Sequence, residues 1–417
     1  MKRSERFRKL GSTAAVLACL ALGVAACGGD DDDSSSDSKK PSTSGGVALK
    51  CKDGAITVGI AKAQSGGSSF FDVAGARGAK IAIDEINADG GLKGCPLKVI
   101  EGDTKSDPAV GAQVARSLVD KGAQILLVPD DFDQGIAAAR VGQEAGVLTF
   151  STAAGSTEFA KAVGDKFFNG APATTQLGAA QANFALENGW KRTYMVLDPG
   201  LAYFTEQDTA YRETYEAGGG KMVGTDKVDS LSGKTDFAST VSKIKGMNPP
   251  PTVIEAQMVF PAVGTFVKQL RAAGVDTEVL GNVTLQTREL PKLVGPAGSR
   301  DVAYATQVYF EGAGIDPKTD PGIDKFAKAY EAKFGNFPEQ GNGPGSYQFM
   351  LAVNKALQED GVVDAASAAA AIRKQANVAV PGNELVRWED GHAVWNITVS
   401  GLNSDGDWEQ FAVVPAE

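Results

Sequence analysis

The fold is decided by residues 56–101, where two strand-like runs flank a helical pattern. The first run, residues 56–60, reads ITVGI, and the second, residues 97–101, reads LKVIE. Between them, apolar residues recur at intervals of three and four, which predicts an amphipathic helix over about residues 72–88. A strand, a helix and a second strand in this order are typical of a unit in which the two strands lie parallel.

The same alternation continues along the chain. Further strands are predicted at residues 125–128, 147–150, 166–168, 193–197, near 223, 252–256 and 279–280. Helices are predicted from Asp107-Pro108 onward and at about residues 134–144, 205–217, 237–245 and 263–273. The pattern predicts an α/β protein with parallel, doubly wound sheets, and a break at residues 170–172 divides it into two lobes.

The end of the chain has a different pattern. Two apolar runs, Leu385–Trp388 and Val394–Val399, flank the sequence Glu-Asp-Gly-His at residues 389–392. An Asp-Gly pair between two strands favours a tight turn, so we expect an antiparallel hairpin here.

Composition excludes several classes of function. The 417 residues include 41 Lys and Arg against 51 Asp and Glu, for a net charge of −10, which disfavours nucleic acid as a partner. A single histidine, His392, argues against most histidine-based catalysis and most zinc sites. Four cysteines without a CxxC pair argue against a zinc ribbon or an iron–sulfur cluster.

The N-terminus has the pattern of an export signal. Basic residues precede an apolar run that ends in Val-Ala-Ala at residues 24–26, followed by Cys27. This ending resembles a bacterial lipobox, so we expect residues 1–26 to be a signal peptide and Cys27 to carry lipid. An ordinary signal peptide followed by a chance cysteine is the alternative. Residues 27–50 are rich in Asp, Ser and Gly, and we expect them to form a flexible tether.

Export makes a disulfide between Cys51 and Cys95 the expected state. Each cysteine lies a few residues before a predicted strand, so parallel neighbouring strands would bring both to one end of the sheet. An oxidising compartment favours the bond. Two free, buried thiols are the alternative.

Signatures of enzymes are weak, and we expect neither catalysis nor a cofactor. No G-x-S-x-G motif occurs, and His392 falls in the predicted turn. Gly233-Lys234-Thr235 resembles the end of a P-loop, but Val228 replaces the glycine that the motif requires. The carboxylates of residues 130–133 follow a predicted strand, and either contact a ligand or cap the next helix. We expect no metal site, and interpret residues 403–407 as a hairpin turn.

Ordered motifs give the chain a resemblance to a known family. They read GARGAKIAIDEINADGGL at residues 75–92, EAGVL at 144–148, STAA at 151–154, TDF at 235–237, KIK at 243–245 and LRAAG at 270–274. In this order they resemble the type I periplasmic binding proteins, and most of all the branched-chain amino acid receptors of ABC importers. The resemblance covers nearly all of residues 54–417.

The resemblance implies two Rossmann-like lobes joined by a three-strand hinge. Crossovers are expected near residues 168–172, 305–308 and 377–380. Residues 51–172 and 308–379 would then form the N-terminal lobe, and residues 173–307 and 380–417 the C-terminal lobe. It also implies a monomer, anchored by lipid outside the cytoplasm, that captures a small polar solute and delivers it to a membrane permease. A ligand-sensing receptor domain and an extracytoplasmic hydrolase are the alternatives.

Candidate ligand-binding residues follow the strands that the resemblance aligns. Aromatic contacts are expected from Phe71, Tyr203 and Phe260, although packing in the core is an alternative for these side chains. The remaining candidates are polar or small: Asp131, Asp133, Ser151, Ala153, Gly155, Gln257 and Asn282.

Two positions depart from the amino acid receptors that the chain resembles. Those receptors hold the α-carboxylate in a Ser-x-Ala-Ala-Thr loop and the ammonium with an acid after a late strand. Here Gly155 replaces the threonine and Val283 replaces the acid. We therefore expect weak or no binding of leucine, isoleucine or valine, and a neutral or cationic ligand instead. An alignment shifted so that Asn282 or Gln257 supplies the anchor is the alternative.

Overall fold

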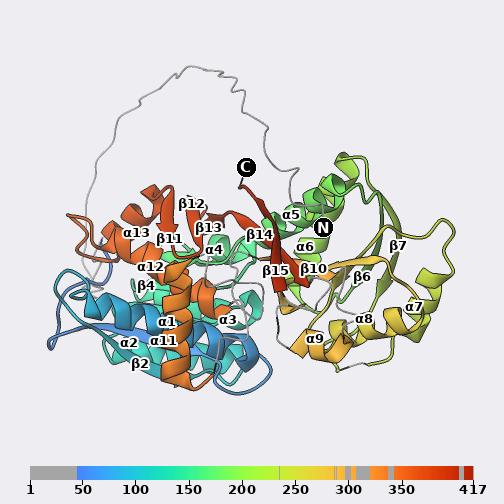
Figure 1. Ribbon diagram of the computed structural model, residues 1–417. Coiled ribbons are helices and arrows are strands. Elements are labelled where there is room, and N and C mark those ends of the chain that lie inside the picture. Colours follow the sequence, from blue (N-terminus) through green and yellow to red (C-terminus); the bar gives the residue numbers. More distant parts are fainter. Residues whose placement is uncertain are drawn as a thin grey trace, which may run out of the picture. The chain divides into compact units, whose positions relative to one another are not determined.

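The computed structural model describes residues 45–233, 235–285, 287, 289–295, 302–306, 320–336, 342–402 and 408–416. In these residues the strands form an eight-stranded sheet and a seven-stranded sheet, both with helices packed against them (Figure 1). The predictions for the signal peptide, for Cys27 and for the turn at residues 403–407 lie outside the described residues.

The first sheet has a parallel centre and an antiparallel edge. Its strands are, in spatial order, β11 (Val378–Val380), β12 (Asn383–Glu389), β13 (His392–Trp395), β5 (Phe167–Asn169), β4 (Leu148–Ser151), β3 (Ile125–Val128), β1 (Ile56–Lys62) and β2 (Leu97–Asp103). The five strands from β5 to β2 are parallel to their neighbours.

Helices cover both faces of this sheet. One face packs against α1 (Ser69–Ala88), α11 (Pro321–Phe334), α12 (Asn342–Leu357) and α13 (Ala365–Lys374). The other face packs against α2 (Pro108–Asp120), α3 (Phe132–Glu144) and α4 (Thr157–Val163). Helices α1 and α12, far apart in sequence, lie side by side (Figure 1). Strands buried on both faces explain the continuous apolar runs of the sequence.

The second sheet repeats this plan. Its strands are, in spatial order, β15 (Trp408–Val414), β14 (Ile397–Leu402), β10 (Val302–Thr306), β9 (Glu278–Gly281), β8 (Val253–Gln257), β6 (Arg192–Leu197) and β7 (Lys221–Lys227). Helices α5 (Thr174–Glu187) and α6 (Ala202–Ala217) cover one face. Helices α7 (Ala238–Lys245), α8 (Ala262–Ala272) and α9 (Glu289–Val294) cover the other.

The strand and helix predictions between residues 56 and 280 are confirmed, with ends that differ by a few residues. The register of β1 and β2 pairs Ile56 with Leu97 in parallel, so the residues before both strands lie at one end of the sheet. A disulfide joins Cys51 to Cys95 there, with the two Cα atoms 5.6 Å apart. The doubly wound α/β fold class is confirmed as well.

The hairpin after residue 380 is present, but its second strand is shorter than expected. Strand β12 pairs with β13 around Asp390-Gly391, and both belong to the first sheet rather than to the second. Asn396 divides the largely apolar run at residues 394–399. Trp395, before it, is buried in the core of the first sheet, and Ile397, after it, is buried in the core of the second sheet. After this hairpin the chain therefore returns to the second sheet at β14, and not near residue 380 as the resemblance implied.

The end of the expected tether is packed rather than extended. Residues 45–50 lie against the start of α13, where the amides of Ala365 and Ala366 donate to the carbonyls of Val47 and Gly45. The first amides of a helix have no partner within the helix, so this segment supplies the missing acceptors. Leu49 is buried in the first core. The expected tether thus overlaps the folded chain by six residues, 45–50.

Candidate functional site

Ligands of open α/β sheets bind beyond the carboxyl ends of the parallel strands. In the first sheet these ends lead into the loops after β1, β3 and β4. In the second sheet they lead into the loops after β6, β8 and β9. The candidate residues lie in or beside these loops.

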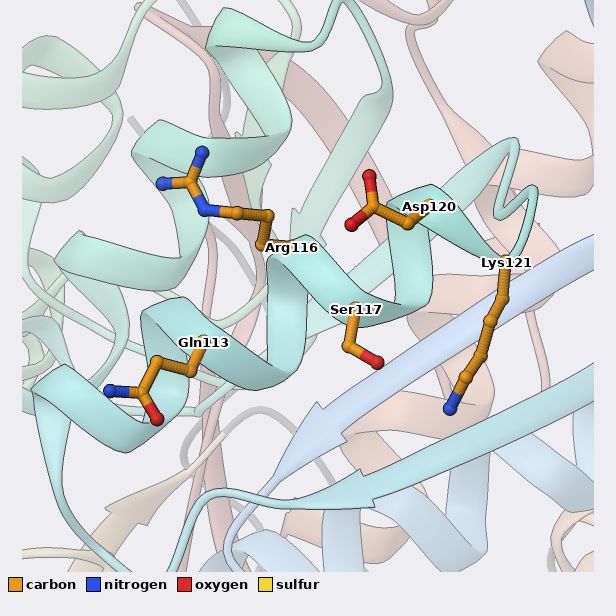
Figure 2. A pocket seen from close by; sticks show the side chains of 5 residues that line it. All are labelled: Gln113, Arg116, Ser117, Asp120 and Lys121. Atoms are coloured by element: carbon orange, nitrogen blue, oxygen red, sulfur yellow. The ribbon is translucent and has the colours of Figure 1, made fainter.

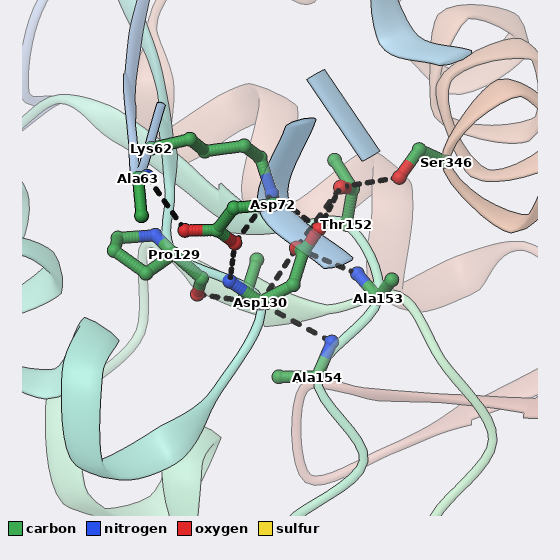
Figure 3. Close-up of polar contacts among 10 residues, drawn as sticks. Lys62, Ala63, Asp72, Pro129, Asp130, Thr152, Ala153, Ala154 and Ser346 are labelled. Atoms are coloured by element: carbon green, nitrogen blue, oxygen red, sulfur yellow. Dashed lines mark hydrogen bonds and ion pairs between the residues drawn. The ribbon is translucent and has the colours of Figure 1, made fainter. Parts of the chain in front are cut away.

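A buried ionic cluster lies at the carboxyl end of the first sheet. Lys62 ends β1, Asp72 lies in the first turn of α1, and Asp130 follows β3. The Lys62 ammonium is 2.5 Å from an Asp130 carboxylate oxygen and 3.9 Å from one of Asp72 (Figure 3). All three side chains are at most 1% exposed. Two carboxylates and one ammonium thus share a site without water contact.

Backbone amides fix Asp72 in this cluster. Its two carboxylate oxygens accept hydrogen bonds from the amides of Ala63 (2.7 Å) and Asp130 (2.8 Å). Burial raises the pKa of Asp72 to about 7, and the positive charge of Lys62 opposes this rise. Asp72 therefore joins the loops after β1 and β3.

The neighbouring loop after β4 donates to Asp130. The Ala153 amide and the Thr152 hydroxyl donate to the Asp130 carboxylate at 2.9 and 3.1 Å. The Ser151 hydroxyl lies 3.3 Å from the same carboxylate and 3.2 Å from the carbonyl of Pro129. The predicted residues Ser151 and Ala153 thus contact Asp130, one of the carboxylates of residues 130–133 for which the sequence left ligand contact and helix capping open.

The other carboxylates after β3 lie apart from this cluster. Asp131 is half-buried and is the N-cap of α3, accepting from the Gln134 amide at 3.1 Å. Burial raises the pKa of Asp131 to about 6. Asp133 is exposed in the first turn of α3. The capping interpretation of the sequence is confirmed for Asp131.

Gly155 has a steric reason to lack a side chain. A Cβ placed on it would lie 2.9 Å from Thr174 Cγ2 and 3.4 Å from Tyr203 Cε2. The threonine found at this position in the resembling receptors would therefore collide with Thr174. Nearby, Glu206 of α6 accepts hydrogen bonds from the hydroxyls of Ser156 (2.7 Å) and Thr174. The loop after β4 thus contacts α6 of the second sheet.

The three aromatic candidates have different surroundings. Phe71 lies in the first turn of α1, rather than in the loop before it, and is half-buried. Tyr203 is half-buried in the first turn of α6, and its buried hydroxyl lies beside the backbone of Val283, which follows β9. Phe260 packs against the core under α8. The packing alternative therefore describes Phe260 best.

Gln257 and Asn282 belong to a buried network of amides. Gln257 Nε2 donates to Glu255 at 2.6 Å, and Asn282 Nδ2 donates to Gln257 Oε1 at 3.3 Å and to the carbonyl of Met258 at 3.0 Å. Asn282 Oδ1 accepts from the Thr284 amide. Both side chains are fully buried. Their polar groups are thus already engaged inside the lobe.

Glu255 is the acid of this network. It is fully buried, and its Oε2 has no hydrogen-bond partner in the described part of the chain. Burial raises the pKa of Glu255 to about 8, so its carboxyl group retains a proton at neutral pH. A protonated carboxyl group can donate from Oε2 while Oε1 accepts from Gln257.

This raised pKa predicts a pH dependence of stability. The folded state binds the Glu255 proton more tightly than the unfolded state, so the stability is greatest below the unfolded pKa and falls as pH rises through about 8. The slope for one such group is up to about 1.4 kcal/mol per pH unit. Substitution of Glu255 by glutamine, which does not titrate, is expected to flatten the dependence between pH 5 and 8. Urea unfolding at several pH values measures it.

A matched control is Glu359→Gln, at an exposed position. Its stability curve should run parallel to that of the wild type. Asp72, with its raised pKa, contributes a slope of the same sign in all three proteins, so only the difference between curves reports on Glu255. Parallel curves for wild type and Glu255→Gln would contradict the prediction.

His392 does not lie in the turn where the sequence placed it. It begins β13, is 5% exposed, and pairs with Asn169 of β5 in the sheet. Burial lowers the pKa of His392 to about 4, so the ring is neutral at physiological pH. The turn consists of Asp390 and Gly391, and their positive φ angles leave His392 free to join the strand.

Two surface hollows lie away from the strand ends. One, of about 360 Å³, is lined by exposed polar residues of α2 and the residue after it, Lys121 (Figure 2). The other, of about 600 Å³, lies between residues 45–50 and Val363-Asp364. Over the described residues, no cluster of three or more His, Cys, Asp or Glu is placed to bind a metal ion. Nor does any described helix combine the length and apolar character of a membrane span.

Two members of the buried ionic cluster, Lys62 and Asp72, were not predicted from the sequence. Lys62 ends an apolar strand and Asp72 begins a helix, and neither position distinguishes a buried charge from an exposed one. A lysine that directly continues the apolar run at residues 56–61 is the one available signal, since strands of this sheet are buried on both faces. Glu255, inside the strand β8, carries the same signal, whereas Glu206 on α6 carries none.

Comparisons with known proteins agree with this geometry. The family model described as periplasmic binding protein matches residues 55–407. The leucine-, isoleucine-, valine-, threonine- and alanine-binding protein of Pseudomonas aeruginosa is 23% identical over 311 residues, 73% of this chain and 79% of that protein. The Leu/Ile/Val-binding protein homolog 1 of Brucella suis is 21% identical over 81% of this chain and 91% of that protein.

Solved structures share the fold at low sequence identity. The branched-chain amino acid transporter substrate-binding protein LivJ of Streptococcus pneumoniae, in complex with isoleucine, has a TM-score of 0.72 at 21% identity and covers 86% of this chain and 99% of its own. A solute-binding protein of Rhodopseudomonas palustris, in complex with 3,4-dihydroxybenzoic acid, has a TM-score of 0.71 at 21% identity and covers 87% and 98%. The chain belongs to the periplasmic binding protein family, with the type I fold of the branched-chain amino acid receptors.

Proposed function

We propose that this protein is the substrate-binding component of an ABC importer and captures a small polar solute outside the cytoplasm. The observation that carries the proposal is the family match over residues 55–407, which spans every strand of both sheets except the edge strand β15. Curated relatives that match most of the chain are binding proteins for amino acids. The protein itself carries out no reaction, and the solute passes to a permease in the membrane.

The proposal includes a lipid anchor at Cys27. Its support is the sequence Val-Ala-Ala-Cys at residues 24–27 and the polar stretch that follows. Residues 28–44 would then act as the tether, because residues 45–50 are already packed against the start of α13. A tether of this length allows a monomeric receptor to move between solute and permease while it stays at the membrane.

Capture would use the loops at the carboxyl ends of both sheets. A ligand that contacts both lobes stabilises the arrangement in which it makes more contacts. The candidates that would face it are Phe71, Asp131, Asp133, Ser151, Ala153 and Gly155 from the first lobe and Tyr203 from the second. Gln257, Asn282 and Phe260 would support the second lobe from within, because their side chains are packed inside it. Tyr203 has the strongest case among the aromatic residues, because it adjoins Gly155 and its hydroxyl lies beside the backbone of Val283, between the loops after β4 and β9.

The ligand class follows from charge. Asp131 is a half-buried carboxylate beside the strand ends, and it would repel a ligand carboxylate. The polar groups of Gln257 and Asn282 are engaged within the lobe, so neither is free to anchor an ammonium group as an amino acid receptor requires. A neutral or cationic solute with hydrogen-bond donors therefore fits better than a branched-chain amino acid.

Calorimetry with leucine tests this assignment. The purified full chain is expected to bind leucine with a Kd weaker than about 1 mM, which corresponds to about −4 kcal/mol. The matched probe is 3-methylbutylamine, which is leucine without its carboxylate, and it is expected to bind more tightly than leucine. Micromolar or tighter leucine binding would overturn the proposed ligand class. Mass spectrometry of small molecules that copurify with the chain then identifies the solute.

A further inference from the structure

The Asp130 carboxylate is surrounded by the groups that proteins use to bind a free carboxylate. It accepts hydrogen bonds from the Ala153 amide and from the Ser151 and Thr152 hydroxyls, and it forms an ion pair with the Lys62 ammonium at 2.5 Å. Charge-assisted hydrogen bonds of this kind are short and about twice as strong as neutral ones. These donors form an anion site, and the protein's own side chain fills it (Figure 3).

The surrounding helices are arranged to leave room for this carboxylate. A Cβ on Gly75 of α1 would lie 2.2 Å from Asp130 Oδ2, so only glycine fits there. The hydroxyl of Ser346, in the second turn of α12, lies 2.7 Å from the Thr152 hydroxyl and holds it beside Asp130. Helices α1 and α12 therefore close around the Asp130 carboxylate and leave no space for a second anion beside it.

Three of the donor residues, Ser151, Thr152 and Ala153, lie at the end of β4 and in the loop after it, at the carboxyl edge of the sheet. Ala153 is half-buried there, and its amide is the one donor of the set on a residue that solvent reaches in part. Since Asp130 accepts the hydrogen bond of this amide, the amide is not free to donate to the carboxylate of a ligand that approaches the loop. It would also meet the negative charge of Asp130 and Asp131.

We propose that Asp130 is a specificity-determining residue, an internal carboxylate that occupies the anion-binding donors of the first lobe and so selects solutes without a carboxylate at this edge. This inference rests on the proposed function, because it assumes that solutes bind beside the loop after β4. It assigns the selection to Asp130 and its partners, rather than to Gly155 or Val283.

Acetate tests whether the donors form an anion site. In the full chain carrying Asp130→Ala, acetate is expected to raise the thermal midpoint in a saturable way compared with chloride at the same ionic strength. The wild type, whose site is filled, should show no such shift. Asp130→Asn is the matched control, since its amide fills the same volume and should exclude acetate. Acetate that stabilises all three proteins equally, or fails to stabilise folded Asp130→Ala, would overturn the proposal.

Failure of the alanine variant to fold in chloride does not end the test. The readout is then the yield of refolding from urea, which acetate should increase for Asp130→Ala and leave unchanged for Asp130→Asn. No increase by acetate would again count against the anion site.

A second measurement tests selection itself. The affinity for leucine relative to 3-methylbutylamine is expected to rise at least about tenfold from wild type to Asp130→Ala, and an unchanged ratio would overturn the role in specificity. If neither compound binds to either protein and no solute copurifies, the proposed function is wrong in its ligand class or site. The acetate result still decides whether Asp130 fills an anion site.

Discussion

A chain in which Lys62 is replaced by methionine is expected to lose about 3–5 kcal/mol of unfolding free energy. Methionine fills much of the volume of the lysine but leaves Asp72 and Asp130 buried without their cation. Urea unfolding at pH 8 measures the loss. It should be smaller at pH 5, because the raised pKa of Asp72 allows this carboxylate to take up a proton there.

Lys80→Met is the matched control for this substitution. Lys80 pairs with Glu101 at 2.6 Å, but the two side chains are 23% and 33% exposed. Water replaces a lost partner at such a site, so the cost should be at most about 1 kcal/mol. The double variant Lys62→Met/Asp130→Asn, which also removes a buried charge, should recover part of the stability. Equal costs at Lys62 and Lys80 would show that the buried cluster is not a special source of stability.

Loss of the Cys51–Cys95 disulfide is the second large effect. The bond closes a loop with a sequence separation of 44, and the chain-entropy model gives a loss of about 4 kcal/mol on its removal. The variant Cys51→Ser/Cys95→Ser should therefore unfold at markedly lower urea concentration than the wild type, with a similar dependence on urea.

Reduction of the wild type provides the control for the disulfide. A thiol reductant should lower the stability of the wild type to that of the double variant and leave the double variant unchanged. If the reductant affected both proteins equally, the bond would not be the cause. A difference below about 1 kcal/mol would show that the loop is already constrained in the unfolded chain.

The sequence predicted the individual elements well because each depends on local patterns. The apolar run at residues 125–128 and the Asp107-Pro108 start of a helix are recovered as β3 and the capped start of α2. The disulfide also followed from the sequence, since two cysteines before parallel neighbouring strands must lie at the same end of a sheet.

Assignment of elements to a sheet was less successful where the pattern was ambiguous. The run at residues 394–399 is largely apolar, yet Trp395 and Ile397 are buried in the cores of different sheets on either side of Asn396. An apolar residue indicates burial but does not identify the core that buries it. The polar stretch that ends near Gly46 likewise did not show where a tether would stop, although the carbonyls of Gly45 and Val47 accept hydrogen bonds at the start of α13.

The sequence by itself thus determined the class of fold, the order of its strands and helices, the disulfide and the loops that hold the candidate site. Only the tertiary structure decided the state of the charges in those loops. Lys62, Asp72 and Asp130 are 68 positions apart at most, and their pairing depends on β1, α1 and β3 meeting at one edge. The sequence does not distinguish a charged residue that binds a ligand from one that pairs with a neighbouring charge. The partners of such a residue are determined by the packing of elements that are distant in sequence.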